Sequence, residues 1–206
     1  MDASGQGNNG TCSGTGCPTA GVTGKINMAV QFDGSADFVT LNSSTLQGVT
    51  NTSFSLEAWV SPQDLPPTTC GTNSNTCGYG VMMKPGYHSG LVYMNTGQYS
   101  ADIWNSSNQK FNVMSGLIVP GVYHHVAMTV DDSAKQLHLY VDGKEVSGSP
   151  VSYTGTLRNF GTSPFYVGSG NPTASSWKWM FKGTIDEAGI YNRALPAADV
   201  LSRATK

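Results

Sequence analysis

The chain has 206 residues, and its 11 basic and 13 acidic residues leave a net charge of −2. This balance excludes a basic nucleic-acid footprint, and no lysine or arginine cluster compensates for it locally. No apolar run reaches the roughly 18 residues that a membrane helix requires, so we expect no membrane insertion. Apolar residues make up 38% of the chain, which is enough for a core, and we expect one domain over residues 1–206.

Most of the predicted elements are strands. Apolar and polar residues alternate in Phe54–Val60, and Val122–Val130 and Leu137–Val141 repeat this period of two. Asp142 and Gly143 then supply two residues that tolerate positive φ, as a tight hairpin turn requires. Shorter candidate strands, in chain order, are Met28–Phe32, Asp37–Leu41, Tyr79–Met83, Gly90–Asn95, Tyr99–Asn105, Phe165–Gly168 and Trp177–Phe181.

Glycine and proline interrupt these runs at short intervals, which is typical of sandwiches and jelly rolls. Only Pro196–Ala204 has a helical pattern, with a proline suited to the first turn. We therefore predict an all-β fold, an antiparallel β-sandwich (jelly roll) with one short C-terminal helix. Residues 1–27 are a Gly/Asn-rich N-terminal segment that contains no candidate strand.

The four cysteines form two close pairs in polar loops, Cys12 with Cys17 and Cys70 with Cys77. Neither pair has the spacing of a zinc site. Four cysteines allow three pairings, of which two local disulfides are the simplest. Because disulfides persist in oxidising compartments, we expect an extracellular or cell-surface protein. The alternative is a cytosolic protein in which all four cysteines are reduced.

Six strings occur in the order found in one family: Val30–Val39, Phe54–Val60, Tyr123–Val130, Leu139–Gly143, Phe165–Gly168 and Phe181–Leu195. Together they resemble the laminin-G-like, concanavalin A-like jelly-roll family over about Met28 to Arg203. The segment Asp2–Gly10 resembles the loop that follows the family's first strand. That strand is not found in this sequence, so we expect the chain to start after it or to borrow a strand from a partner.

The fold also hosts glycoside hydrolases, which need two carboxylates on either side of the scissile bond. The chain has three glutamates, and Glu57 has no acidic residue two positions away on its strand. Asp186 and Glu187 would project to opposite faces of a regular strand. His124 and His125 alternate in the same way, and we interpret His125 as structural. We therefore predict that the protein is not an enzyme.

The resemblance implies one structural Ca²⁺, held near the chain ends by carboxylates and carbonyls. The matching positions are Asp33 beside Gly34, and Asp186. Inward placement of both Ile185 and Ala188 would need a bulge near Asp186, which could redirect its carboxylate. The alternative is that the two aspartates bond to backbone amides in their own turns.

A sugar ring stacks on an aromatic side chain, and its hydroxyls bond to polar groups nearby. Trp59 and Trp179 are expected to serve packing. The remaining candidate ligand-binding residues come from the middle of the chain and from one later loop: Tyr87, His88, Tyr99, Asp102, Trp104 and Trp177.

The sequence thus favours a non-catalytic, extracellular, lectin-like module that binds glycan or a cell-surface polymer, in adhesion or targeting. The alternative is a structural subunit or accessory domain of an extracellular filament or surface assembly, joined by protein contacts or edge-strand pairing. A glycoside hydrolase is the weaker alternative.

Overall fold

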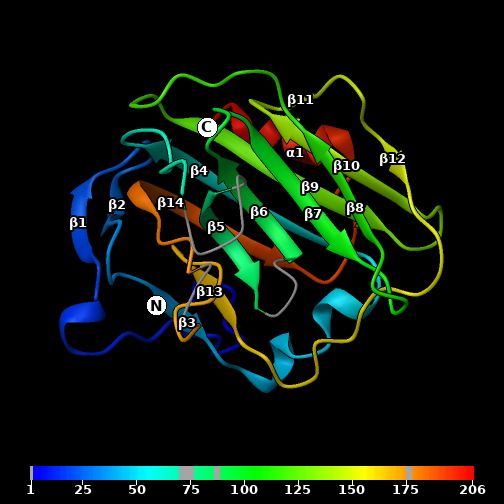
Figure 1. The fold of residues 1–206 in the computed structure, drawn as a ribbon, viewed down its shortest axis with the longest axis horizontal. Helices are drawn as coiled ribbons and strands as arrows, with labels where there is room; N and C mark the ends of the chain where they lie inside the picture. Colours follow the sequence, from blue (N-terminus) through cyan, green and yellow to red (C-terminus); the bar gives the residue numbers. More distant parts are fainter. Residues whose placement is uncertain (1, 70–76, 86–88, 175–177) are drawn as a thin grey trace.

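A computed structural model describes residues 2–69, 77–85, 89–174 and 178–206. Two antiparallel sheets stack face to face (Figure 1). The eight-stranded sheet has the order β1-β2-β14-β4-β9-β10-β11, with β12 also paired to β10. Its strands are β1 (Thr19–Thr23), β2 (Met28–Asp33), β4 (Phe54–Pro62), β9 (His124–Asp131), β10 (Gln136–Val141), β11 (Lys144–Glu145), β12 (Val151–Ser152) and β14 (Lys182–Tyr191).

The six-stranded sheet has the order β3-β13-β5-β6-β7-β8. Its strands are β3 (Val39–Leu41), β5 (Gly78–Lys84), β6 (Ser89–Met94), β7 (Tyr99–Trp104), β8 (Lys110–Met114) and β13 (Phe165–Val167). Three 3₁₀ turns lie at Gly14–Gly16, Ser44–Leu46 and Val49–Asn51, and the helix α1 (Ala197–Ala204) follows β14. The predicted antiparallel sandwich with one C-terminal helix is confirmed.

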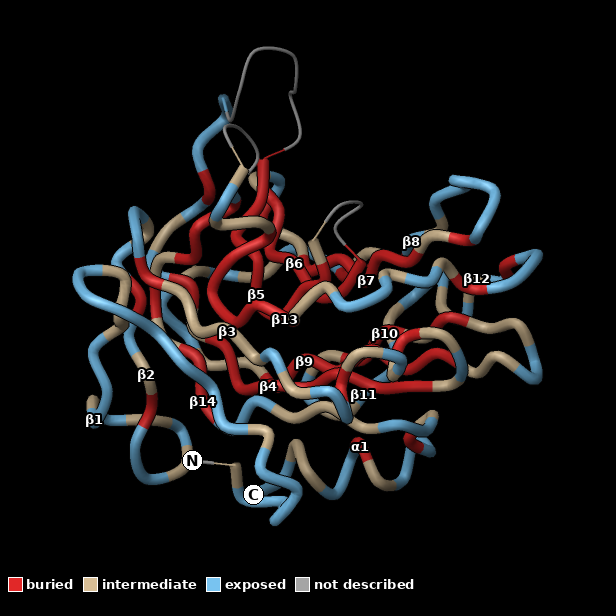
Figure 2. The backbone as a smooth tube through the Cα atoms, turned by 90° about the horizontal axis from the view of Figure 1, so that it is seen from below, coloured by how far each residue is buried: buried red, intermediate tan, exposed pale blue. Residues whose placement is uncertain are grey.

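The core lies between the two sheets, where the buried residues of both layers face each other (Figure 2). Phe54–Val60 is buried on both faces, and the predicted alternation separates them: Leu56, Ala58 and Val60 belong to the main hydrophobic cluster, whereas Trp59 does not. From the other sheet Tyr99 is equally buried, and its hydroxyl donates to the Val60 carbonyl at 3.3 Å. Side chains at every second position therefore join the layers.

The predicted hairpin turn is present between β10 and β11. Asp142 and Gly143 have φ values of 51° and 74°, the positive values that such a tight turn requires. Tyr140 pairs with Glu145, and Val141 with Lys144.

The N-terminal segment contains a strand that the sequence pattern did not indicate. β1 pairs with β2 at the edge of the eight-stranded sheet, and its register shifts between Ala20 and Val22. With a glycine at its centre and one bulky apolar residue, it has no alternation to detect. The preceding residues form a strap, Asp2–Cys17, in which the Thr11 N–H donates to the Thr40 carbonyl of β3 at 2.9 Å.

The local disulfide Cys12–Cys17 is present and closes the end of the strap. Cys77 is also disulfide-bonded, and its predicted partner Cys70 lies outside the described residues. Cys12 and Cys17 are only five positions apart. Because a disulfide that closes a short loop stabilises a fold less than one that closes a long loop, reduction of this bond should cost little stability.

The strand predicted at Trp177–Phe181 is wrong for its described part, residues 178–181, which carry no strand. Trp179 has φ 49°, which breaks an extended chain. Trp179 is 9% exposed, which confirms the prediction that it is buried. It packs with Met83, Val92 and Met94 in a small cluster separate from the main core.

A bulge interrupts β14 near Asp186, at the position where inward placement of both Ile185 and Ala188 would have required one. The register against β4 shifts between Asp186 and Gly189, and Glu187 has φ 49°. Ile185 is in the core, but Ala188 is exposed, so its expected inward placement is wrong. Because a bulge inserts one extra residue, the alternation along the strand no longer tells which side the residues after it face.

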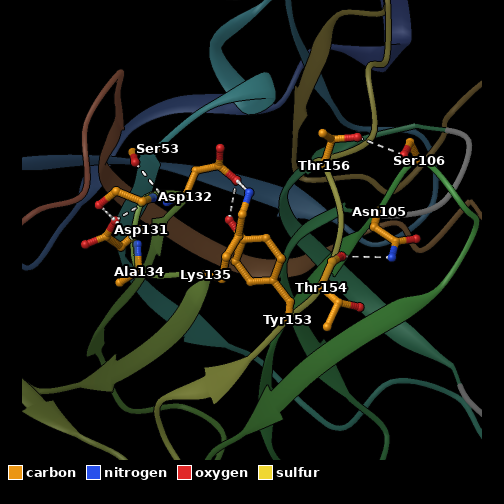
Figure 3. A network of polar contacts seen from close by, with 11 residues as sticks. Ser53, Asn105, Ser106, Asp131, Asp132, Ala134, Lys135, Tyr153, Thr154 and Thr156 are labelled. Carbon is orange, nitrogen blue, oxygen red and sulfur yellow. Dashed lines mark hydrogen bonds and ion pairs between the residues drawn. The ribbon is translucent and has the colours of Figure 1, made fainter.

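A polar network fixes the long connection between the two sheets (Figure 3). The Tyr153 hydroxyl and the Lys135 ammonium both donate to Asp132 Oδ1 at 2.7 Å. Farther along, Asn105 Nδ2 donates to the Thr154 carbonyl at 3.0 Å. These bonds hold residues 153–158 beside the end of β7.

Among the described residues, no helix is both long and apolar enough to cross a membrane.

Candidate functional site

The outer side of β7 carries the residues that are best placed to bind a ligand. The side chains of Tyr99, Ala101 and Ile103 point into the core and are at most 2% exposed. Because side chains alternate along a strand, Asp102 and Trp104 point away from the core. Trp104 is partly exposed, so an aromatic side chain stands at the surface of the six-stranded sheet.

The edge strand β8 flanks this surface on one side. Lys110 pairs directly with Trp104, and Asn112 with Asp102. The Lys110 ammonium lies 2.9 Å from Asp102 Oδ2, and the Ser100 hydroxyl donates to Asp102 Oδ1 at 2.6 Å. Lys110 and Asn112 are exposed, so hydrogen-bonding groups lie beside the aromatic ring.

The connection held by the polar network flanks Trp104 on the other side. The Arg158 N–H donates to the Trp104 carbonyl at 2.9 Å, and Asn105 bridges to Leu157 as in an antiparallel ladder. Arg158 is therefore the cross-strand neighbour of Trp104 opposite Lys110. Its guanidinium donates to Asn108 Oδ1. We call Asp102, Trp104, Lys110, Asn112 and Arg158 the Trp104 face.

Burial dominates the electrostatics of Asp102. It is 1% exposed, and this desolvation raises its pKa, although Lys110 and Ser100 act in the opposite direction. The Asp102 side chain is held in place by its partners, whereas Lys110 and Asn112 are exposed and Trp104 is partly exposed.

The structure brings two of the predicted ligand residues together, and ligand binding by them stays a prediction. Asp102 and Trp104 lie together on one face, whereas Tyr99 lies in the core with no exposed surface and cannot contact a ligand there. Tyr87, His88 and Trp177 lie outside the described residues.

Lys110, Asn112 and Arg158 were not predicted. Their segments gave no strand signal, because β8 has a single buried residue and Arg158 lies in a connection. Only the cross-strand pairing places them beside Trp104.

The three predicted calcium ligands do not form one site in this structure. Asp33 pairs with Lys182, four residues before Asp186 on β14, which separates the two aspartates by about 13 Å along the strands. Asp33 Oδ1 accepts the Ser35 and Ala36 N–H groups, and Asp186 Oδ2 accepts the Ile26 N–H at 2.8 Å. Hydrogen bonds from Ser35 and these amides hold the pKa of Asp33 well below its usual range.

The bonds of Asp33 are those of the alternative expectation, in which the aspartate serves its own turn, whereas Asp186 bonds to the distant Ile26 of the β1–β2 connection. Gly34 contributes a φ of 79° beside Asp33. Among the described residues, no three His, Cys, Asp or Glu side chains are grouped to hold a metal ion. Calcium binding stays a prediction of the family resemblance.

The outer face of the eight-stranded sheet carries a second polar cluster, made by Glu57, His125, Tyr191 and Arg203. Glu57 Oε1 accepts the Tyr191 hydroxyl at 2.7 Å and an Arg203 N–H at 3.1 Å. Glu57 Oε2 lies 3.4 Å from His125 Nε2. Glu57 and His125 are 4% and 2% exposed, so α1 and its neighbours cover this cluster.

Glu57 and Asp186 both line one cavity of about 710 Å³ beside the strap. Because glycoside hydrolysis needs two carboxylates in one cleft, this pair bears on the question of catalysis. Burial alone would raise the pKa of Glu57, but hydrogen bonds from His125 and Tyr191 and the charge of Arg203 hold it below its ordinary value. A glycosidase acid needs a raised pKa. The lowered pKa of Glu57 therefore fits an ionised carboxylate better than the acid of such a pair.

The fold and this arrangement define a class, the antiparallel jelly-roll sandwiches. Within that class, the family described as the concanavalin A-like lectin/glucanases superfamily, of laminin G type, matches residues 33–201, and the chain belongs to this family. A search of curated proteins found no match.

Solved structures share the fold at low identity. The binding domain of the Paraclostridial Mosquitocidal Protein 1 matches with a TM-score of 0.71 and 16% identity, over 98% of this chain and 48% of that one. Domain 4 of AbnA, a GH43 extracellular arabinanase from Geobacillus stearothermophilus in complex with arabinotriose, matches at 0.63 and 20%, over 92% and 82%. The binding domain of Botulinum neurotoxin serotype G matches at 0.67 and 13%, over 98% and 47%. This chain thus spans about half of the two toxin domains.

Proposed function

We propose that this protein is a non-catalytic, lectin-like module that binds glycan or a cell-surface polymer through the Trp104 face, in adhesion or targeting. The observation that carries the proposal is a partly exposed tryptophan on a sheet surface, with exposed Lys110 and Asn112 at neighbouring positions.

This arrangement matches what a sugar requires. The C–H groups of a pyranose pack on an aromatic ring, and its hydroxyls accept from and donate to side chains around the ring. Asp102 and Arg158 hold their positions through bonds to Ser100, Lys110 and Asn108. The polar groups are therefore ordered before a ligand arrives, which lowers the entropy cost of binding.

The comparisons support a binding role by analogy of fold. The arabinanase domain was solved with arabinotriose, and both toxin matches are described as binding domains. Glu57 is bonded to Tyr191 and Arg203, and no second acidic residue lies two positions away on its strand, which supports a role without catalysis. The Cys12–Cys17 disulfide supports secretion into an oxidising compartment.

The test is a glycan array probed with the wild-type chain and with Trp104→Ala. We expect saturable binding to at least one glycan, lost in Trp104→Ala. Tyr123→Ala is the matched control, since Tyr123 is also a partly exposed aromatic residue but lies before β9, and it should bind normally. Equal binding by Trp104→Ala, or no glycan binding by the wild type, would contradict the proposal.

A structural role through protein contacts is the second candidate function, favoured by one specific observation. Leu65, Leu117, Val119 and Val122 are 50–81% exposed, and both Leu65 and Leu117 reach the space above Gly97. Exposed apolar patches mark interaction surfaces. Edge pairing is less favoured, because β1 is bulged at its edge and β3 is already paired by Thr11.

The two candidates differ in concentration dependence. Analytical ultracentrifugation of the wild type and of Leu117→Ser should show reversible assembly, lost in the variant, if the apolar patch joins copies of this chain. A monomer at all concentrations would remove self-assembly from consideration.

A further inference from the structure

We infer that the eight-stranded sheet binds an extended segment of a partner polypeptide, which pairs with β14 as an added strand and has apolar side chains at alternating positions. This inference is independent of the Trp104 face, which lies on the other sheet. It assigns a peptide partner in addition to the proposed glycan. It depends on a gap beside β14 and on the cavity beneath that gap.

The gap is a stretch of β14 that has a neighbouring strand on one side only. On that side, β4 pairs with β14 as far as Tyr191. On the other side, β2 pairs only with Lys182–Ile185. Among the described residues, no further strand pairs with β14, and no backbone hydrogen bond joins β14 to the strap. The main chain of Glu187–Tyr191 therefore presents an unpaired edge inside the sheet.

The cavity of about 710 Å³ opens onto this edge, and its lining includes residues 187–191 and core side chains from both sheets. Four of these core side chains pack against the main hydrophobic cluster but are only partly buried: Val30, Val39, Leu41 and Ile190. The main core is therefore incompletely covered beneath the gap.

The strap borders the cavity without filling it. It contributes only small or polar side chains to the lining: Asp2, Ala3, Ser4, Asn8 and Gly10. Its own hydrogen bonds are made elsewhere, because the N–H groups of Ser4 and Asn8 both donate to the Asp2 carboxylate at 2.9 Å. The apolar side chains beneath the gap thus receive no large apolar partner from the strap.

An unpaired edge above an apolar cavity is suited to a strand. The edge offers N–H and C=O groups at the spacing of a ladder, which the backbone of an extended peptide matches. Side chains of a strand point alternately to its two faces, so every second one enters the cavity and covers Leu41 and Ile190. The others face outward, beside Tyr191, whose hydroxyl bonds to Glu57. Apolar and polar residues therefore alternate in the partner segment.

The gap is a better docking position than the outer edge of the same sheet. β1 at that edge is exposed along most of its length, so a strand added beyond it would bury little apolar surface. A strand in the gap gains main-chain bonds to β14 and also buries its apolar side chains against a core that is already formed. Both terms favour binding at the gap.

The experiment measures amide hydrogen exchange of the full chain by NMR, alone and with a panel of synthetic octapeptides. Each peptide carries valine, isoleucine, leucine or phenylalanine at alternating positions between threonines and lysines. Its control has the same composition with the apolar residues in one block, which directs only half of them into the cavity. We expect fast exchange of the gap-facing amides of Glu187–Tyr191 in the free chain. At least one alternating peptide should slow this exchange, and its block control should not.

A blocking variant tests the position of the peptide. Ala188 is exposed and lines the cavity, so Ala188→Arg places a large charged side chain at the gap. It should abolish the protection and leave glycan binding unchanged. Ala134→Arg is the matched control, because Ala134 is exposed in the β9–β10 turn and is not part of the cavity lining. This variant should bind the peptide normally, and urea unfolding shows whether both variants are folded.

Any of three results would overturn the inference. The first is slow exchange of the gap-facing amides in the free monomer, which would mean that the edge is already satisfied. The second is a lack of protection by every alternating peptide. The third is protection without peptide in a dimer of this chain, which would assign the gap to a second copy. Failure to bind any glycan, with peptide protection intact, would overturn the proposed function alone.

Discussion

On the outer face of the eight-stranded sheet, Trp59 and Glu57 lie beneath other side chains, and Arg203 of α1 bonds to the carboxylate. On the outer face of the six-stranded sheet, Trp104 and Asp102 occupy comparable positions with Lys110 as the cation. Trp59 is 5% exposed, whereas Trp104 is partly open to solvent. The same three kinds of side chain thus occur on both faces.

The two outer faces differ in what covers them, and this difference decides the role of the side chains on each face. Val200 of α1 and Leu195 pack against Ala127 and Tyr140, closing the eight-stranded sheet. The ring of Trp59 contacts His125 edge to face at 5.4 Å and has the Lys25 ammonium above it at 4.8 Å. No helix of the described residues packs on the β7–β8 surface. The covered trio therefore serves stability, and recognition is the role that we propose for the other.

The largest contrast is expected between the two tryptophans. Trp59→Ala should lower the free energy of unfolding by about 3–5 kcal/mol, the usual effect of removing a buried tryptophan. Trp104→Ala should cost clearly less stability and should abolish glycan binding. Urea unfolding and glycan titration measure the two effects. The reverse pattern would show that the two faces have been assigned the wrong roles.

The ion pairs give the next contrast. Arg203→Met leaves the Glu57 carboxylate, which is 6% exposed, without its cation, and should cost about 2 kcal/mol, less than in a fully buried pair because the Arg203 side chain is 30% exposed. Arg193→Met is the matched control. Arg193 pairs with Asp199 at the surface, so unfolding by urea should change by less than about 0.5 kcal/mol. Equal effects of the two substitutions would argue against a structural role for the Glu57 cluster.

The two buried carboxylates should respond to pH in opposite directions. The pKa of Glu57 is lowered by folding, so its stabilising contribution is present above its unfolded pKa and is lost as the pH falls through the folded one. The pKa of Asp102 is raised by burial, so its ionised form opposes folding above the folded pKa, and acid relieves this cost.

Unfolding by urea at neutral and acidic pH separates these contributions. Glu57→Gln should destabilise the chain most at neutral pH. Asp102→Asn should increase the free energy of unfolding at neutral pH, and its difference from the wild type should shrink in acid. A destabilised Asp102→Asn at neutral pH would mean that the pair with Lys110 outweighs the desolvation of Asp102.

The smallest effect is expected from Asn112. Its side chain is exposed beside Asp102, so Asn112→Ala should change the free energy of unfolding by no more than about 0.5 kcal/mol. Affinity for the glycan should fall a few-fold, because one hydrogen bond is lost. An unchanged titration would place the sugar away from β8.

The fold could be predicted from the sequence because its strongest signals are local. The alternation in Phe54–Val60 and the Asp142–Gly143 turn each specify their structure without distant contacts. β1 could not be predicted, because Thr19–Thr23 has no alternation and is held by pairing with β2. The bulge in β14 was predictable, but Ala188 was not, since Glu187 turns the chain at that point.

The site was predictable only where residue type alone is informative. Trp104 and Asp102 lie two positions apart on one strand, so their common face follows from the period of two. Tyr99 belongs to the opposite face of the same strand, where the Val60 carbonyl accepts from its hydroxyl, so its selection as a ligand residue was wrong. Arg158 lies 54 positions after Trp104 in the chain. It comes close to Trp104 only because its segment pairs with the end of β7, which no local pattern encodes.

We propose that the Trp104 face, and not the face covered by α1, recognises the ligand. The most direct measurement is a two-dimensional NMR titration of the ¹⁵N-labelled chain with the glycan that binds best on the array, following side-chain N–H signals. Saturable shifts of the Trp104 indole and Asn112 amide signals, with the Trp59 indole signal unchanged, are the predicted result. Saturable shifts of the Trp59 signal with those of Trp104 and Asn112 unmoved would contradict the claim.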